Sequence, residues 1–257
     1  MNRPAAKGWC PSAHRPMMSG DGLVVRIRPR LGRLTRDQVL GLCTAARRFG
    51  SGMIDLTNRA NLQLRGVTEE NHAALVTELE ALDLVDGNPE HEARRNILTA
   101  PLWRTGDDTE RLAHELATRV TTLPDLPVKF GFAVDAGDAP ILGSASADIR
   151  IERGQSGGLI VRADGALQGQ SVSVDDAVEA AAELADWFLQ TGGADSHRMA
   201  RLLSTTPLPD GMQQEAPAEA IHPLVPGMTS HGLICGAPLG QTTADELESL
   251  IHLSDAT

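Results

Sequence analysis

The sequence predicts an α+β protein that begins with a β-α-β-β-α unit, and three observations carry this prediction. Residues 22–29 (GLVVRIRP) alternate apolar and polar side chains, as a half-buried strand does. Residues 55–66 (DLTNRANLQLRG) contain two shorter alternating runs joined by a turn, which indicates a β-hairpin. Thr35 and Thr68 precede amphipathic segments, where threonine caps the free N–H groups that begin a helix.

The first strand and the first helix each have one apolar face. Leu23, Val25 and Ile27 lie on one side of the strand, and Arg26 and Arg28 lie on the other. Residues 35–38 (TRDQ) form a capping box. The helix that follows has an apolar stripe and ends at a glycine, and its stripe is Val39, Leu42, Cys43, Ala46 and Phe49.

The hairpin also has an apolar face, formed by Ile54, Leu56, Leu62 and Leu64. Two helices can cover only one face of so small a sheet, so the other face is predicted to be open. The residues on this open face are Arg26, Arg28, Thr57, Arg59, Gln63 and Arg65, with Asn61 in the turn. A strand surface of Thr, Asn, Gln and Arg without Lys or Glu favours a planar, anionic ligand.

The second part of the chain is predicted as a loop over residues 84–104, followed by an antiparallel meander and helices. The predicted helices are 109–120, 174–189 and 196–203, and the predicted strands are 128–135, 148–152 and 158–163. Lys129 is placed in the first of these strands. Short glycine-bearing loops between the strands favour antiparallel pairing.

The last part of the chain repeats the beginning. Residues 232–235 match 22–25, and residues 240–247 match 32–39, each copy with a capping box. A chance recurrence of strand, loop and helix is the alternative. A strand and a helix alone leave an unpaired edge and half a core, so we expect the fold to continue beyond Thr257 or to be completed by another chain. The predicted divisions are an N-terminal segment 1–21, a first unit 22–85, a second domain 86–204, a linker 205–227 and an incomplete second copy 228–257.

Composition excludes several classes of protein. Of the 257 residues 41% are hydrophobic, no run is long enough to cross a membrane, and the first twenty residues lack the apolar core of a signal peptide, which predicts a cytoplasmic protein. The three cysteines, Cys10, Cys43 and Cys235, lie far apart and form neither a disulfide framework nor a metal motif. Nucleotide-binding and serine hydrolase motifs are absent from the sequence.

The charge distribution is uneven. The net charge of −11 combines +4 over residues 1–104 (15 Lys and Arg, 11 Asp and Glu) with −15 over the remainder (8 and 23). Residues 22–65 contain nine Arg and two Asp. Single-stranded nucleic acid would need stacking aromatic residues, but aromatics are 3% of the chain and none lies on the open face. We therefore expect no nucleic-acid partner and no membrane partner.

Ordinary structural roles are the alternative for each candidate residue. The arginines of the open face can be solvated or paired with acids. Arg95 and Asn96 can brace the loop before Pro101. Lys129 can extend its apolar stem along the sheet and place its ammonium in water.

Three segments resemble the superfamily of sirohaem-dependent sulfite and nitrite reductases. Residues 57–66 (TNRANLQLRG) resemble its T-x-R-x-x-x-Q signature, residues 94–98 (RRNIL) with Pro101 resemble its R-N-[VI] segment, and residues 126–135 (LPVKFGFAVD) resemble its L-P-x-K-F strand. The resemblance implies a ferredoxin-like half-domain, a sulfite-reductase-like α/β domain with antiparallel strands, and the start of a second half-domain.

Within that superfamily, residues 8–29 (GWCPSAHRPMMSGDGLVVRIRP), residues 231–240 (HGLICGAPLG) and Gly131, where the reductases have a second lysine, most resemble the precorrin-3B synthases of aerobic cobalamin synthesis. The resemblance implies an oxidoreductase that uses dioxygen and an electron donor to hydroxylate precorrin-3A and form a lactone. It implies a tetrapyrrole-binding role for Arg28, Thr57, Arg59, Asn61, Gln63, Arg65, Arg95, Asn96 and Lys129. No residue is assigned to proton transfer.

The resemblance also implies cofactors. The superfamily holds a [4Fe-4S] cluster through four cysteines in two paired groups, and its reductases bind sirohaem. This chain has no paired cysteines, so a polypeptide that carries them is an expected partner. A sirohaem-dependent sulfite or nitrite reductase and a non-catalytic tetrapyrrole-binding subunit are the competing functions.

The cysteine count generates a first prediction. The purified chain should lack the visible absorption of an iron-sulfur centre, because three scattered cysteines cannot supply four cluster ligands. An absorption spectrum with an iron and sulfide assay checks this, and a stoichiometric cluster on this polypeptide would contradict it.

Overall fold

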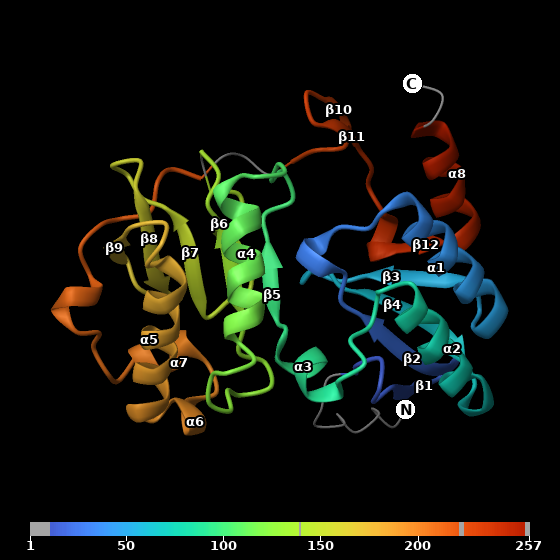
Figure 1. Ribbon diagram of the computed structural model, residues 1–257, viewed down its shortest axis with the longest axis horizontal. Coiled ribbons are helices and arrows are strands. Elements are labelled where there is room, and N and C mark those ends of the chain that lie inside the picture. The colour runs from blue at the N-terminus through green and yellow to red at the C-terminus, as the bar shows by residue number, and fades with distance from the viewer. Residues whose placement is uncertain (1–10, 139, 221–223, 255–257) are drawn as a thin grey trace.

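A computed structural model describes residues 11–138, 140–220 and 224–254, so Cys10 and Thr257 lie outside the described residues. Within these ranges the strands form two five-stranded sheets and one two-stranded hairpin. Figure 1 shows the two sheets next to each other, with helices packed on each. This arrangement confirms the predicted α+β class. None of the described helices has the length and apolar character needed to span a bilayer.

The first sheet contains the predicted β-α-β-β-α unit. Its strands, in spatial order, are β1 (Met17–Ser19), β2 (Gly22–Ile27), β4 (Leu62–Val67), β3 (Met53–Leu56) and β12 (Gln241–Thr243), and all neighbours are antiparallel. Helices α1 (Arg36–Phe49) and α2 (Glu69–Ala81) pack on one face through Leu42, Leu75 and Leu79, all fully buried. Strand β1 was not predicted because three residues carry too little periodicity.

The two helices begin where the capping threonines predict. The Thr35 hydroxyl accepts from the Gln38 N–H at 3.2 Å, and the Gln38 side chain accepts from the Thr35 N–H at 2.9 Å. The Thr68 hydroxyl accepts from the Asn71 N–H at 3.2 Å. At the end of α1, a Cβ on Gly50 would lie 2.4 Å from the Arg65 carbonyl oxygen, so this helix can end against β4 only at glycine.

The second sheet is mixed rather than a simple meander. In order it contains β5 (Ile97–Thr99), β6 (Phe132–Asp135), β7 (Ile149–Arg153), β8 (Leu159–Ala163) and β9 (Gln170–Val172). The first three strands are parallel and the last two pairings are antiparallel. The predicted antiparallel pairing of β6 with β7 is wrong, because Phe132 to Asp135 pair with Ile149 to Glu152 in parallel.

The helices of the second part cover one face of this sheet. They are α4 (Asp108–Arg119), α5 (Ala177–Gln190), α6 (Gly193–Ser196) and α7 (Met199–Leu203). Leu116 and Phe188 pack there against Val134, Ile149 and Ile151 of the sheet. The short helix α3 (Pro89–Arg94) links the two sheets. It falls in the segment predicted as a loop.

Lys129 lies in a turn and not in a strand. The Phe130 N–H donates to the Pro127 carbonyl at 2.7 Å, so the chain turns immediately before β6 begins at Phe132. The predicted strand from residue 128 is therefore wrong for its first four residues. The cause is the Pro-bearing approach, whose apolar and polar alternation imitates a strand.

The chain after α7 lies along the second sheet and then repeats the first unit. Within the predicted linker, Glu215 and Pro217 form bridges with Gly169 and Gly154. Beyond it come β10 (Gly227–Thr229), β11 (Gly232–Ile234) and α8 (Ala244–Ser254), and α8 packs beside α1.

Backbone geometry supports the predicted repeat. The β10–β11 hairpin pairs Thr229 with Gly232, as β1–β2 pairs Ser19 with Gly22. The two copies also share a left-handed leucine, with φ of 51° at Leu31 and 56° at Leu239. The Thr243 hydroxyl accepts from the Glu246 N–H at 3.1 Å, and Glu246 accepts from the Thr243 N–H at 2.8 Å, which is the second capping box.

The face of the second sheet opposite α4 and α5 buries charged side chains. Asp135 is 2% exposed, and one of its carboxylate oxygens accepts from the N–H groups of Ile141 and Leu142 at 2.6 Å each. Its other oxygen has no hydrogen-bond partner among the described residues. Burial raises the pKa of Asp135 above its ordinary value of 3.8.

The raised pKa of Asp135 should make the free energy of unfolding fall as the pH rises. The folded state holds this proton more tightly than the unfolded chain, so the contribution of Asp135 to the free energy of unfolding falls once the pH exceeds 3.8. Asp135→Asn should therefore gain stability relative to wild type between acidic and neutral pH, as measured by urea unfolding. The exposed Asp195→Asn is the control, and a constant difference for Asp135→Asn would contradict the prediction.

Leu64 tests the core of the first sheet. It is fully buried on β4, and Leu64→Ala should lower the free energy of unfolding by about 2–5 kcal/mol because it leaves a cavity. Leu167→Ala, at a position 89% exposed, should cost roughly 0.5 kcal/mol or less. Urea denaturation measures both, and equal losses would show that β4 does not lie in the core.

Candidate functional site

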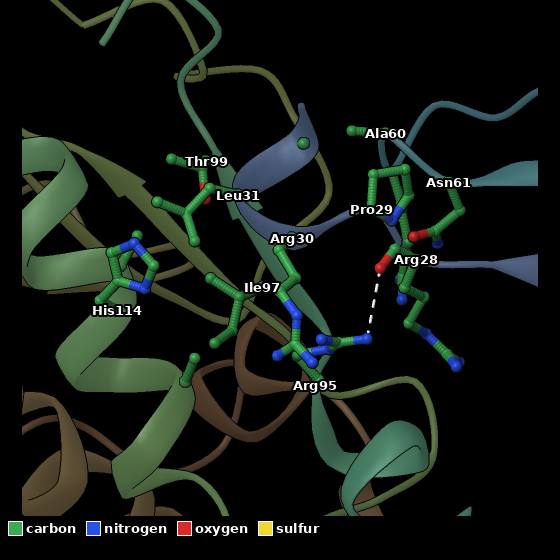
Figure 2. A pocket seen from close by; sticks show the side chains of 14 residues that line it. Arg28, Pro29, Arg30, Leu31, Ala60, Asn61, Arg95, Ile97, Thr99 and His114 are labelled. Atoms are coloured by element: carbon green, nitrogen blue, oxygen red, sulfur yellow. Dashed lines mark hydrogen bonds between the residues drawn. The ribbon is translucent and has the colours of Figure 1, made fainter. Parts of the chain in front are cut away.

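A small pocket lies where the two sheets meet (Figure 2). It has a volume of about 50 Å³, and the loop after β2, the turn between β3 and β4, strand β5 and helix α4 surround it. Four predicted site residues line it: Arg28, Arg59, Asn61 and Arg95. Residues far apart in the sequence thus converge on one cavity with a cationic wall. We call this cavity the junction pocket.

The turn of the hairpin carries Arg59 to the second sheet. The Thr57 N–H donates to the Asn61 carbonyl at 2.9 Å, and the Asn61 N–H donates to the Thr57 hydroxyl at 3.2 Å. Ala60 has φ of 52°, a conformation that L-residues rarely adopt. Arg59 then donates to the Ser146 hydroxyl at 3.1 Å and to the Lys129 carbonyl at 3.4 Å. The Lys129 side chain itself is exposed.

Arg28 and Arg95 share one buried acid, Glu92. Arg28 Nη1 donates to Glu92 Oε1 at 3.0 Å, and Arg95 Nη2 donates to Glu92 Oε2 at 2.8 Å. Arg95 Nη2 also donates to the Arg28 carbonyl at 3.3 Å, the dashed contact of Figure 2. Nε of Arg28, and Nε and Nη1 of Arg95, are buried without a partner among the described residues. Arg28 and Arg95 both line the junction pocket, so these N–H groups are unused hydrogen-bond donors in its wall.

Further residues of the junction pocket were missed by the sequence reasoning. Arg30, Thr99 and His114 line it, and Figure 2 shows His114 on α4. Glu92 was missed because it lies in the segment predicted as a loop. The signal that marks it is its place three residues before Arg95 on one helical turn, where oppositely charged side chains can meet.

The other predicted site residues lie outside the junction pocket. Arg65 donates to Asp21 at 2.9 Å and to Asp55 at 3.3 Å, and the hydrogen bond from Arg65 lowers the pKa of Asp21. The Gln63 side-chain oxygen accepts from Arg26 Nη2 at 2.8 Å in its hydrogen-bonded amide orientation. Arg65 and Gln63 of the open face are therefore hydrogen-bonded to other residues of the same unit.

Thr57 lies beside a second cavity of about 300 Å³, which is mostly apolar. Leu56 and Leu247 line this cavity. It shares Pro29, Gly32, Ala60 and Asn61 with the junction pocket, so the two cavities are neighbours. We call it the apolar cavity.

Asn96 explains why glycine stands at position 131. The Asn96 side-chain amide donates to the Phe130 carbonyl at 2.6 Å, and a Cβ on Gly131 would lie 2.6 Å from the same amide nitrogen. The Gly131 N–H donates to the buried Asp148 carboxylate at 3.0 Å. A lysine at this position would have to displace Asn96.

The chain's own residues do not fit a [4Fe-4S] cluster. The sequence has three cysteines where a cluster needs four thiolates. Cys43 is fully buried in α1, and Cys235 is exposed near β11. Among the described residues no group of His, Cys, Asp and Glu is arranged to hold a metal ion. The arginine and amide donors of the junction pocket do fit the carboxylates of a tetrapyrrole.

Comparisons with known proteins identify a similar domain family and a similar solved structure. Residues 15–82 match the family model of the nitrite/sulfite reductase ferredoxin-like half domain. The solved structure of the Mycobacterium tuberculosis NirA protein aligns over 90% of this chain and 50% of that chain, with a TM-score of 0.61 and 18% identity. Residues 15–82 are therefore similar to a nitrite/sulfite reductase ferredoxin-like half domain, and the chain shares the fold of that structure.

A more specific likeness is to precorrin-3B synthase from Sinorhizobium sp., which is 38% identical over 155 residues. That alignment covers 57% of this chain and 32% of the relative, so the match spans about a third of the relative's length.

The contact between Gly131 and Asn96 can be tested by a double-mutant cycle. Gly131→Ala should cost about 1–3 kcal/mol of unfolding free energy, and it should cost less when Asn96 is already alanine. Gly137→Ala, whose Cβ would meet no atom within 4 Å, is the control. Urea unfolding measures all four variants, and an equal cost in both backgrounds would contradict the contact.

Proposed function

We propose that this chain is part of a precorrin-3B-synthase-type oxidoreductase of cobalamin synthesis and that the junction pocket binds an acidic group of its tetrapyrrole substrate, precorrin-3A. One observation carries the proposal: Arg28, Arg59 and Arg95 come from separate segments and line the same cavity. The similarity to precorrin-3B synthase supports this substrate over sirohaem. Gly131 supports it as well, since the superfamily's reductases have lysine there.

The size of the junction pocket determines which part of the substrate it takes. A volume of about 50 Å³ accepts one acidic side arm and excludes a macrocycle. The neighbouring apolar cavity is about 300 Å³ and suits the edge of a pyrrole ring. The macrocycle would then lie over the hairpin turn at Ala60, with a carboxylate on the arginines.

The remaining candidates would extend this site. If the macrocycle lies along the sheet face, Thr57, Gln63 and Asn96 are neutral donors to further acid groups, and Arg65 and Lys129 are charged ones. Arg65 would have to exchange Asp21 for the ligand.

The reaction proposed is dioxygen-dependent hydroxylation of precorrin-3A with lactone formation from a ring A acetate, supplied with electrons by a separate donor. This chain's residues would bind and orient the macrocycle through its carboxylates. Cationic donors held in place also stabilise negative charge that develops in the reaction. A polypeptide with paired cysteines would supply the iron-sulfur cluster.

Titration with sirohaem, an acidic tetrapyrrole, tests the binding site. Arg59→Ala should weaken affinity about tenfold or more, because it removes a charged donor to a carboxylate. Arg48→Ala, whose side chain pairs with Glu78 on the helical face, should bind like wild type. Unchanged affinity in Arg59→Ala would argue against the junction pocket. Arg65→Ala shows whether the ligand reaches along the hairpin.

A further inference from the structure

We propose that Glu92 is a positioning residue of the junction pocket: it holds Arg28 and Arg95 in the orientation that presents their remaining N–H groups to an acidic ligand. The part of this inference that concerns the ligand rests on the proposed function. The part that concerns the two arginines rests on the contacts of Glu92 alone.

Glu92 is fully buried and both of its carboxylate oxygens are occupied. Oε1 accepts from Arg28 at 3.0 Å, and Oε2 accepts from Arg95 at 2.8 Å and from the Asp86 N–H at 3.3 Å. Arg28 follows β2 of the first sheet, and Arg95 precedes β5 of the second. One carboxylate therefore joins arginines from both sheets.

Because Glu92 is fully buried, its charge has to be paired with the two arginines. A buried carboxylate is strongly unfavourable unless it is paired and hydrogen-bonded, and the same holds for a guanidinium group. The side chains of Arg28 and Arg95 are each 12% exposed. Glu92 neutralises one of these two arginines, and Arg30, which lines the same pocket, is paired with Asp83 at 2.8 Å.

Because a guanidinium group is planar, pairing one of its nitrogens with Glu92 also fixes the direction of the other nitrogens. A guanidinium group is planar, and its five N–H donors have fixed directions. Fixing one Nη of Arg28 on Glu92 directs its Nε, and fixing Nη2 of Arg95 directs its Nε and Nη1. These three nitrogens are the buried ones without a partner among the described residues. Glu92 thus uses one edge of each group and leaves the rest for the ligand.

Hydrogen bonds at the start of α3 position Glu92 on the helix. The Asn88 side chain caps this helix by accepting from the Glu90 N–H at 2.9 Å, and Pro89 stands at its first turn. The Glu92 N–H donates to the Asn88 carbonyl at 3.0 Å. From this fixed start a glutamate reaches both arginines, whereas an aspartate is one methylene shorter.

The first arm of the test observes the arginines directly, without ligand. In a ¹⁵N–¹H spectrum of arginine side chains, wild type should show slowly exchanging guanidinium signals from Arg28 and Arg95, assigned with Arg28→Lys and Arg95→Lys. Glu92→Gln keeps the shape and removes the charge, and both signals should lose their protection. Glu90→Gln, exposed on the same helix, should leave them unchanged.

Signals that stay protected in Glu92→Gln would overturn the inference. If Glu92→Gln does not fold, as judged by circular dichroism, Glu92→Asp replaces it. The shorter aspartate keeps the charge and should release at least one of the two arginines; protection of both would overturn the inference equally.

The second arm measures sirohaem affinity under conditions in which circular dichroism shows each variant folded. Glu92→Gln should weaken binding about tenfold or more although the pocket becomes more positive, because charge without orientation does not make paired hydrogen bonds. Affinity equal to or above that of wild type would show that Glu92 has a structural role only. If wild type itself does not bind sirohaem, the proposal that the junction pocket binds acidic tetrapyrroles in general fails, and the spectrum still decides whether Glu92 orients the arginines.

Discussion

A single buried carboxylate connects the two halves of this protein. Glu92 accepts hydrogen bonds from Arg28, at the end of a strand in the first sheet, and from Arg95, at the start of a strand in the second. A buried Glu92, Arg28 or Arg95 would be strongly unfavourable without its charged partner. The same three side chains therefore hold the two sheets together and form the cationic wall of the pocket. The orientation of the two arginines therefore depends on the arrangement of the sheets.

The arginines of the open face and those of the junction pocket differ in their partners. Arg65 is held by Asp21 and Asp55, so this part of the open face is electrically balanced. At the junction, Glu92 balances only one of two arginines, and Arg59 reaches across to neutral oxygens of Ser146 and Lys129. The excess positive charge therefore gathers at the junction, which is why an anionic group is the ligand that the pocket suits.

Equivalent leucines differ in burial between the two copies of the internal repeat. Leu31, in the loop that borders the junction pocket, packs against the core of the second sheet, and Leu23 is 7% exposed. Their counterparts in the second copy, Leu239 and Leu233, are 98% and 58% exposed in the part of the chain that the structure describes. The corresponding leucines of the second copy are therefore exposed to solvent in the described residues, whereas those of the first copy are packed.

The sequence by itself determined the local structure wherever the signal lies within one helical turn or one strand. Thr35, Thr68 and the alternation of the hairpin suffice because capping and periodicity involve neighbours in the chain. Only the tertiary structure decided that β6 and β7 run parallel, that Lys129 lies in a turn, and that Glu92 joins Arg28 to Arg95. The strand pairing and the contacts of Glu92 depend on residues far apart in sequence, where burial and charge pairing override local preference. The turn at Lys129 is closed locally, from the Phe130 N–H to the Pro127 carbonyl, and its alternating side chains imitate a strand. The arginines could be named in advance, whereas for the acid the sequence offers only its spacing of three residues from Arg95, because its contact with Arg28 exists only where the two sheets meet.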